Sequence, residues 1–364
     1  MPARADGERR LIRLGDVSLL LLLLGLWPIA WLLPERLWPD AVNAILPIVQ
    51  KSGKARARLA HIQNVLQDRS HRSRQIDEES ARNWLLKQLQ LLRAYRPGGW
   101  RPKITVDGHE HIDAALARGC GVILWTPPFC FNEFISKIGL REAGFRLTHV
   151  VIPTHGWSNT HFGVRVLNPQ WTRIEKRYLE RQIVISDGNW GQAKSDPRPH
   201  GIHLFSATRP SISRDTVPVS FSLSAIRQVL RGNGVVLIAA RKGAARRPAT
   251  IRLLNARFPL GLGPAVLAYD CGAALIPVYT LRESVDSYRV VVDPALPIRR
   301  DLARYEAALD AAQKLAARLE HHIRAHPGQW NWWETMRDST NEAGQSLDMR
   351  AERNEVDRLT ATSG

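Results

Sequence analysis

Hydrophobic positions change their spacing along the chain and divide it into four regions. Val17–Leu33 is apolar throughout, and residues 41–95 place apolar side chains at three- and four-residue steps. From residue 101 onward, short apolar runs alternate with amphipathic stretches, while residues 338–364 are polar and have no period. In order, these patterns predict a hydrophobic helix, a group of packing helices, alternating strands and helices, and a disordered tail.

The alternation after residue 101 predicts an α/β fold with a largely parallel sheet flanked by helices. We expect strands at 104–106, 122–125, 150–153, 183–186, 235–239, 274–279 and 289–292. We expect helices at 110–118, 133–143, 175–181, 222–231, 264–270 and 302–325. Residues 188–220 are rich in Gly, Pro, Ser and His, and they predict a long surface loop.

These boundaries predict four parts of the chain. Residues 1–38 form a basic segment and a membrane anchor, and residues 39–100 form a helical lead-in that ends near the breaker Arg96-Pro97-Gly98-Gly99. Residues 101–337 form the α/β domain, and residues 338–364 form the polar tail.

The apolar stretch Val17–Leu33 predicts the anchor. As a helix it reaches about 25 Å at ~1.5 Å per residue, against a hydrocarbon core of about 30 Å. It can therefore just span a bilayer, or lie tilted in it with Trp27, Trp31 and Trp38 at the interface. A cleaved signal peptide is the alternative, but no small-x-small cleavage site follows Leu33. Basic residues lie on both sides, so the positive-inside rule leaves the orientation open.

Composition adds a strong positive charge to this picture. The formal net charge of +17 favours acidic partners, namely nucleic acid, anionic lipid or an acidic carrier protein. Twelve tryptophans and the apolar anchor favour the lipid surface, and no nucleic-acid-binding motif is present, so we expect no nucleic-acid partner. The three cysteines have no C-x-x-C spacing, which argues against a disulfide framework and a metal site.

One loop is the first candidate for chemistry. The stretch Gly121–Phe134 has the sequence GVILWTPPFCFNEF, in which a buried strand meets a Pro127-Pro128 turn before a helix begins. In α/β proteins, loops at the carboxyl ends of parallel strands carry most functional side chains. We therefore expect the functional site beside this loop.

The order of several motifs resembles the lipid A biosynthesis acyltransferases, the lauroyl/myristoyl branch of the lysophospholipid acyltransferase superfamily. After the hydrophobic anchor, the matching stretches are GVILW, TRIEKRYLERQIVI, AIRQVLRGNGVVLI, GLGPAVLAYDCGAALIPVYTLR and LEHHIRAHPGQWNWW. Together with the anchor they span roughly residues 17–337 in the order of the family.

The resemblance implies a membrane-associated enzyme at the cytoplasmic face of a bacterial inner membrane. Such an enzyme moves a fatty acyl group from a thioester, carried by acyl carrier protein or coenzyme A, to a hydroxyl of a lipid or glycolipid. The thioester is a co-substrate, and we expect no further cofactor and no metal.

The catalytic motif of that family is His-x-x-x-x-Asp/Glu, and this sequence departs from it. The acid falls on Glu133, whereas the histidine position holds Pro128, which has no titratable group and cannot act as a base. None of the other histidines has an acid five positions later.

Three interpretations follow from this departure. In the first, Glu133 supports the site, and His155 or His161, from the loop after the next strand, supplies the base. In the second, Cys130 acts as a nucleophile. In the third, the chain is a non-catalytic lipid-binding or assembly protein that has lost the histidine.

Several basic residues are candidates for binding the substrate. Arg241 and Lys242 directly follow the strand at 235–239 and can hold a phosphate of a lipid or of the carrier, although a solvated basic loop explains them equally well. Arg165 follows the strand expected at 150–153, and ordinary turn chemistry explains it equally well. Arg282 matches an arginine of the family after Pro277.

Overall fold

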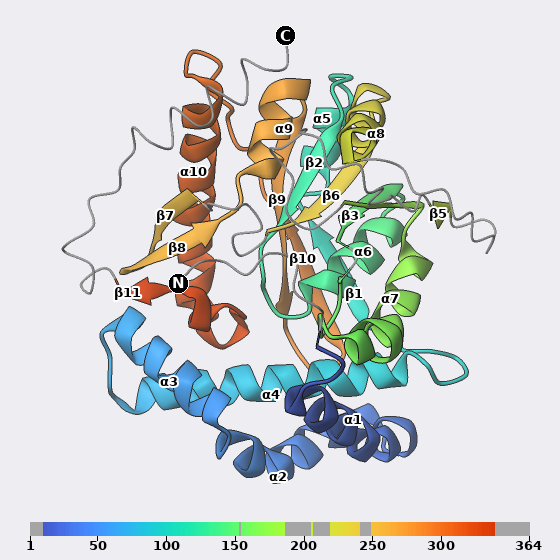
Figure 1. The fold of residues 1–364 in the computed structure, drawn as a ribbon, viewed down its shortest axis with the longest axis vertical. Helices are drawn as coiled ribbons and strands as arrows, with labels where there is room; N and C mark the ends of the chain where they lie inside the picture. The colour runs from blue at the N-terminus through green and yellow to red at the C-terminus, as the bar shows by residue number, and fades with distance from the viewer. Residues whose placement is uncertain (1–9, 153, 186–204, 207–218, 241–248, 339–364) are drawn as a thin grey trace.

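The computed structural model describes residues 10–152, 154–185, 205–206, 219–240 and 249–338 (Figure 1). Its main sheet has the strand order β1-β10-β9-β2-β6-β3-β4-β5. In that order the strands are Lys103–Asp107, Ser287–Val292, Ala274–Arg282, Val122–Thr126, Val235–Ala239, Leu147–Val151, Arg181–Val184 and Phe205–Ser206. Neighbours pair in parallel except β10 with β9 and β4 with β5, which confirms the predicted α/β fold with a largely parallel sheet.

Helices cover both faces of this sheet, and the alternation of side chains along the strands explains why. The helices are α5 Glu110–Leu116, α6 Asn132–Glu142, α7 Asn168–Glu175, α8 Val219–Arg231, α9 Gly263–Cys271 and α10 Arg304–Ala325. In β2, Ile123 and Trp125 join the core formed with α8, α9 and α10. Val122 and Leu124 point the other way, into the core formed with α5, α6 and α7.

An N-terminal layer of helices lies across one end of the sheet (Figure 1). It consists of α1 Leu14–Leu32, α2 Trp38–Gln50, α3 Gly53–Leu66 and α4 His71–Arg93. Within the described ranges, α1 is the helix that is long and apolar enough to cross a membrane by length and composition. The long helix α4 packs against α1 and α2 in this layer. Its residue Leu91 also belongs to the core of the α/β domain, so α4 joins the two parts.

The C-terminal segment around Pro327–Gln329 is hydrogen-bonded to α4. The side-chain amide of Asn83 donates to the carbonyl oxygen of Gly328 at 3.1 Å. A Cβ atom at position 328 would lie 2.3 Å from the carboxyl group of Glu79, so glycine lets this side chain of α4 lie close to the C-terminal segment. Helix α4 therefore runs past the carboxyl ends of the strands and is held there by the C-terminal segment.

The structure corrects two local predictions. The helix predicted at 175–181 is wrong: α7 ends at Glu175, a short 3₁₀ turn follows over Lys176–Tyr178, and Arg181 already starts β4. Residues 249–260, for which no strand was predicted, form a hairpin of β7 Ala249–Leu253 and β8 Ala256–Leu260. This hairpin pairs with β11, Arg337–Asp338, in a second sheet.

Two predicted segments lie largely outside the described residues. Of the predicted surface loop at 188–220, the structure describes Phe205–Ser206, which form β5, and the start of α8. Of the predicted tail at 338–364 it describes Asp338, which pairs with Ala256.

Candidate active site

The loop after β2 is tightly fixed. The carbonyl oxygens of Pro128 and Phe129 accept hydrogen bonds from the backbone and side-chain amides of Asn331, each at 2.9 Å. The side-chain amide of Asn132 donates to the carbonyl oxygen of Pro127 at 2.8 Å, across the base of the same loop. The C-terminal segment therefore covers the loop in which Pro128 occupies the position of the family's histidine.

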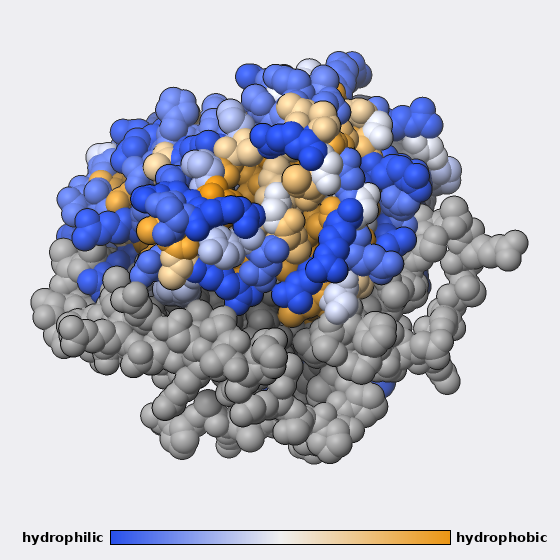
Figure 2. All heavy atoms as spheres, turned by 90° about the horizontal axis from the view of Figure 1, so that it is seen from above, coloured by the Kyte–Doolittle hydropathy of each residue, from blue (hydrophilic) through white to orange (hydrophobic). Residues whose placement is uncertain are grey.

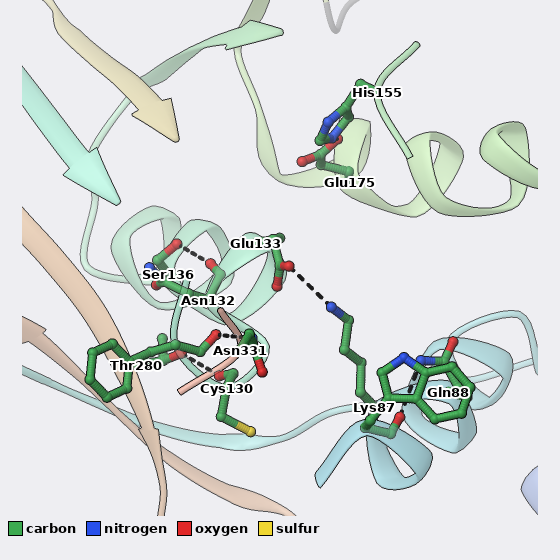
Figure 3. Close-up of polar contacts among 12 residues, drawn as sticks. Lys87, Gln88, Cys130, Asn132, Glu133, Ser136, His155, Glu175, Thr280 and Asn331 are labelled. Carbon is green, nitrogen blue, oxygen red and sulfur yellow. Dashed lines mark hydrogen bonds and ion pairs between the residues drawn. The ribbon is translucent and has the colours of Figure 1, made fainter. Parts of the chain in front are cut away.

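Glu133 lies in the first turn of α6 and faces the helix α4. One carboxylate oxygen is 3.1 Å from the ammonium nitrogen of Lys87, and the two side chains point toward one another in Figure 3. The same ammonium lies 4.5 Å from the ring centre of Trp171. The second oxygen of Glu133 is buried and has no hydrogen-bond partner, although the side chain as a whole is 33% exposed. The ionisable partner of Glu133 is therefore a lysine and not an imidazole.

A second group of polar side chains contains an imidazole, which the Glu133–Lys87 pair lacks. His155, in the loop after β3, lies with its Nε2 atom 2.9 Å from Oε2 of Glu175, the last residue of α7 (Figure 3). The other carboxylate oxygen, Oε1, forms a buried ion pair with Lys137 of α6, and Nδ1 of His149 in β3 lies 3.5 Å from it. We call Lys137, His149, His155 and Glu175 the Glu175 cluster.

The charges within the Glu175 cluster compensate one another. Burial alone would raise the pKa of Glu175, but its interactions with His155 and with the Lys137 ammonium hold that pKa well below its ordinary value. Burial lowers the pKa of Lys137, and the attraction of Glu175 opposes that shift. Burial and the neighbouring Lys137 charge also lower the pKa of His149 well below its ordinary value, so its imidazole is neutral. The cluster thus contains one buried carboxylate and one buried ammonium.

His155 is the member of the Glu175 cluster that is partly exposed and lines a cavity. Its side chain is 23% exposed, whereas Glu175 is fully buried. A cavity of about 170 Å³ lies against His155, and its walls come from the carboxyl ends of β3, β4 and β6, including Val151, Ile185 and Ile238. Ligand pockets for complete small molecules usually measure about 300–1,000 Å³. The cavity formed by the described residues is smaller than that range.

An ionised carboxylate can only accept hydrogen bonds, so Nε2 of His155 must carry the proton that it shares with Glu175. In the neutral imidazole the other ring nitrogen, Nδ1, is then the basic atom. The arrangement is a histidine oriented by a buried acid, with its side chain at the edge of a cavity. This is the pairing that general-base catalysis needs, although its acid is Glu175 and not the predicted Glu133.

The structure places the other predicted residues in different surroundings. His161 has an exposed side chain, and its backbone N–H donates to the carbonyl oxygen of Arg10. Arg165 is exposed in the turn of π-helix at Gly163–Leu167. Arg241 and Lys242 directly follow β6, which helps to line the cavity, but they lie outside the described residues.

Arg282 and Cys130 contact each other away from this cavity. The guanidinium Nε of Arg282 donates to the sulfur of Cys130 at 3.4 Å, and its Nη2 donates to the side chain of Gln90 at 3.0 Å. The guanidinium also lies 4.9 Å from the ring centre of Tyr288. Cys130 is buried, so this pair joins β9 to α4 and the loop after β2 within the protein interior.

Sequence reasoning missed Lys137, His149 and Glu175. A weak signal for two of them was present, because Lys137 and His149 interrupt apolar runs in a predicted helix and beside a predicted strand. Glu175 had no comparable signal, since it lies in a run of charged residues. The described parts of the chain contain no group of three side chains arranged to hold a metal ion.

The fold and this site define an α/β protein whose candidate base lies at the carboxyl edge of a parallel sheet. Residues 202–335 match the family model described as bacterial lipid A biosynthesis acyltransferase. Over 232 residues the chain is 24% identical to the phosphatidylinositol mannoside acyltransferase of Mycobacterium tuberculosis strain H37Rv, and equally to that of strain CDC 1551. These alignments cover 62% of this chain and 58% of each relative, so the match spans less than two thirds of the curated relatives. The two comparisons confirm the resemblance to the lipid A biosynthesis acyltransferase family.

Proposed function

We propose that this protein is an acyltransferase that moves a fatty acyl group from a thioester to a hydroxyl of a lipid or glycolipid. The family match and the acyltransferase relatives support the reaction class. The observation that carries the proposal for this chain is the hydrogen bond between His155 and Glu175 at the edge of a cavity. It supplies an oriented base although Pro128 stands where the family has its histidine.

In the proposed reaction, Nδ1 of His155 accepts the proton of the acceptor hydroxyl. The hydroxyl oxygen then forms a bond to the thioester carbonyl carbon, the carbon–sulfur bond breaks, and the proton passes from the imidazole to the departing thiolate. Glu175 holds the ring and stabilises the imidazolium while it carries the extra proton. Lys137 is a positioning residue, because its ammonium keeps the buried Glu175 ionised.

The partners of this reaction are part of the proposal. The donor is acyl carrier protein or coenzyme A, both of which are acidic and suit a chain with a net charge of +17. The acceptor is a lipid or glycolipid of the lipid A type, and the location is the cytoplasmic face of a bacterial inner membrane. The family match and the apolar helix α1 support this location.

The test is acyl transfer by the purified full-length protein, with labelled acyl thioesters of several chain lengths and a total lipid extract. We expect His155→Ala to lower the rate by about 10²–10⁴-fold, the usual contribution of a general base. The matched control is His161→Ala, which removes an exposed imidazole from the same loop. We expect it to change the rate less than about twofold. Equal rates for wild type and His155→Ala would contradict the proposed role of His155.

The second candidate function is lipid binding or assembly without catalysis. The observation that favours it is at the family's own catalytic position, where Pro128 is tied to Asn331 and Glu133 is paired with Lys87. Retained lipid binding without a labelled product, across all chain lengths offered, would favour this function over acyl transfer.

A further inference from the structure

Helix α1 has two different apolar sides. One side packs in the interior of the helical layer through Leu23, Leu26 and Ala30. The other side is uncovered. Its exposed apolar residues recur at three- and four-residue steps from the start of the helix to Trp27, and Leu32 is exposed at its end: Leu14, Val17, Leu21, Leu24, Trp27 and Leu32. We call these residues the uncovered stripe. The helix has 19 residues, so the stripe is about 28 Å long at ~1.5 Å per residue.

The N-terminal end of α1 is hydrogen-bonded to the α/β domain. The buried carboxylate of Asp16 accepts a hydrogen bond from the hydroxyl of Thr160 at 2.7 Å and caps the helix through the backbone N–H of Arg13 at 3.0 Å. Just before the helix, the carbonyl oxygen of Leu11 accepts from the backbone N–H of Phe162 at 2.9 Å. These partners lie in the loop that also carries His155.

The C-terminal end of α1 is hydrogen-bonded to α4. The indole N–H of Trp31 donates to the carbonyl oxygen of Leu92 at 3.2 Å. The guanidinium of Arg93 donates to the carbonyl oxygen of Ala30 at 2.8 Å, and it lies 3.5 Å from the carboxylate of Glu35. Both ends of the helix are therefore tied to the same body, and α1 cannot extend away from the protein unless these bonds break.

The surroundings of the uncovered stripe fit a lipid surface. Two further apolar residues are exposed nearby in the chain: Leu37, just before α2, and Ile48, on α2, the helix that lies beside α1 in Figure 1. Exposed basic side chains flank it at both ends and beyond α2: Arg10, Arg13, Arg36, Lys51 and Lys54. Figure 2 views the protein from above, on the side away from this layer, where hydrophilic side chains surround a central group of hydrophobic ones among the residues described. Exposed apolar side chains with basic residues around them favour contact with the surface of an anionic membrane.

We propose that α1 does not cross the membrane but lies in the plane of its surface, with the uncovered stripe among the acyl chains and the basic rim at the headgroups. The helical layer is then a docking face that brings the loop of His155 close to the lipids. This inference rests on the proposed membrane location and is independent of acyl transfer.

The first experiment measures binding of the full chain to vesicles that contain phosphatidylglycerol and phosphatidylethanolamine. We expect the double variant Leu21→Glu, Leu24→Glu to lower partitioning at least tenfold. The matched control is Ala114→Glu, Ala117→Glu, which adds the same charge at exposed positions on and after α5, away from the layer. We expect less than a twofold change for the control. Equal binding of the two double variants would overturn the docking face.

The second experiment separates lying in the surface from crossing it. In a Cys120→Ser background, which removes the exposed native thiol, Arg10→Cys and Arg36→Cys place a thiol just before and just after α1. With vesicle-bound protein, we expect both thiols to react with an impermeant maleimide added outside. Protection of one thiol would overturn the inference and leave the membrane location intact.

Other outcomes would overturn both statements. Absence of wild-type binding to vesicles would contradict the membrane location as well as the docking face. Wild-type self-association that the Leu21→Glu, Leu24→Glu variant loses, without vesicle binding, would assign the uncovered stripe to a second copy of the chain.

Discussion

Two glutamates near the carboxyl edge of the sheet have opposite surroundings. Glu133 is 33% exposed and has one ionic partner, Lys87. Glu175 is fully buried and touches an ammonium and an imidazole through its two oxygens. Glu133 occupies the position of the acid in the family's His-x-x-x-x-Asp/Glu motif but has no histidine beside it. Glu175 lies outside that motif but is hydrogen-bonded to His155. The comparison shows that a histidine–acid pair can be complete in space where the sequence motif is broken.

Helix α6 connects the two regions. It carries Glu133 in its first turn and Lys137 one turn later, so the acid of the family motif and the counter-ion of Glu175 lie on one rigid element. The two acids therefore differ in burial and in their partners. Replacing each acid in turn and measuring stability and acyl transfer tests the effect of that difference.

The largest expected effect comes from Glu175→Ala. Because the change leaves the ammonium of Lys137 buried without its partner, we expect the free energy of unfolding to fall by about 3–5 kcal/mol. Urea denaturation of the purified protein measures this loss.

The matched control for Glu175→Ala removes both charges. The double variant Lys137→Met, Glu175→Leu has no unpaired ion, so we expect it to regain most of the lost stability but no acyl transfer. A single Glu175→Ala variant as stable as wild type would contradict the buried ion pair.

The next effect depends on pH and involves His149. Its pKa is well below the ordinary value of 6.5 in the folded protein, so the unfolded chain takes up a proton below pH 6.5 and the folded protein does not. Stability is therefore complete above pH 6.5 and falls as the pH is lowered, by at most about 2 kcal/mol at pH 5 for one group. We expect His149→Gln to lose this part of the pH dependence, as measured by denaturation between pH 5 and pH 8.

Two other groups do not interfere with that measurement. Glu175 also has a lowered pKa, but its contribution to stability is lost only as the pH falls below about 4.5, its ordinary value. His322, whose pKa burial lowers to about 4, contributes equally to wild type and variant. Identical pH dependence in wild type and His149→Gln would show that His149 is not the neutral buried group described.

The smallest effect is expected for Glu133→Gln. The pair with Lys87 is partly exposed, and such pairs contribute about 0–1 kcal/mol, so we expect a loss of stability within that range. We also expect acyl transfer to stay within about threefold of wild type. A loss of activity as large as that of His155→Ala would reverse the comparison and make Glu133 the acid of the working site.

The fold was largely predictable because the spacing of apolar residues along the sequence follows which side chains are buried. The strand Val235–Ala239 was predicted with its observed bounds, since every position in it is apolar and a Gly-Asn-Gly turn precedes it. The hairpin of β7 and β8 was missed although its side chains alternate between buried and less buried positions. Pro259 inside β8 argues against a strand, and Leu254 at the turn adopts a left-handed backbone for which leucine gives no signal.

The candidate site was predictable only in part. Loops after parallel strands lie at one edge of a sheet, so His155 could be predicted to lie at that edge, although β6 separates β3 from β2. Its partner could not, because Glu175 lies 20 residues later in the chain and reaches His155 through the packing of α7. The misplaced helix at 175–181 hid this residue further, although Pro169 in the first turn of α7 is a typical start signal.

The bonds from Asn331 to the loop after β2 also have a consequence for the order of assembly. Asn331 follows Phe129 by 202 residues, so this closure cannot form until almost the whole chain has left the ribosome. The uncovered stripe of α1 is complete after residue 32. The proposed contact of α1 with a lipid surface could therefore form during synthesis, before the C-terminal segment closes the loop after β2.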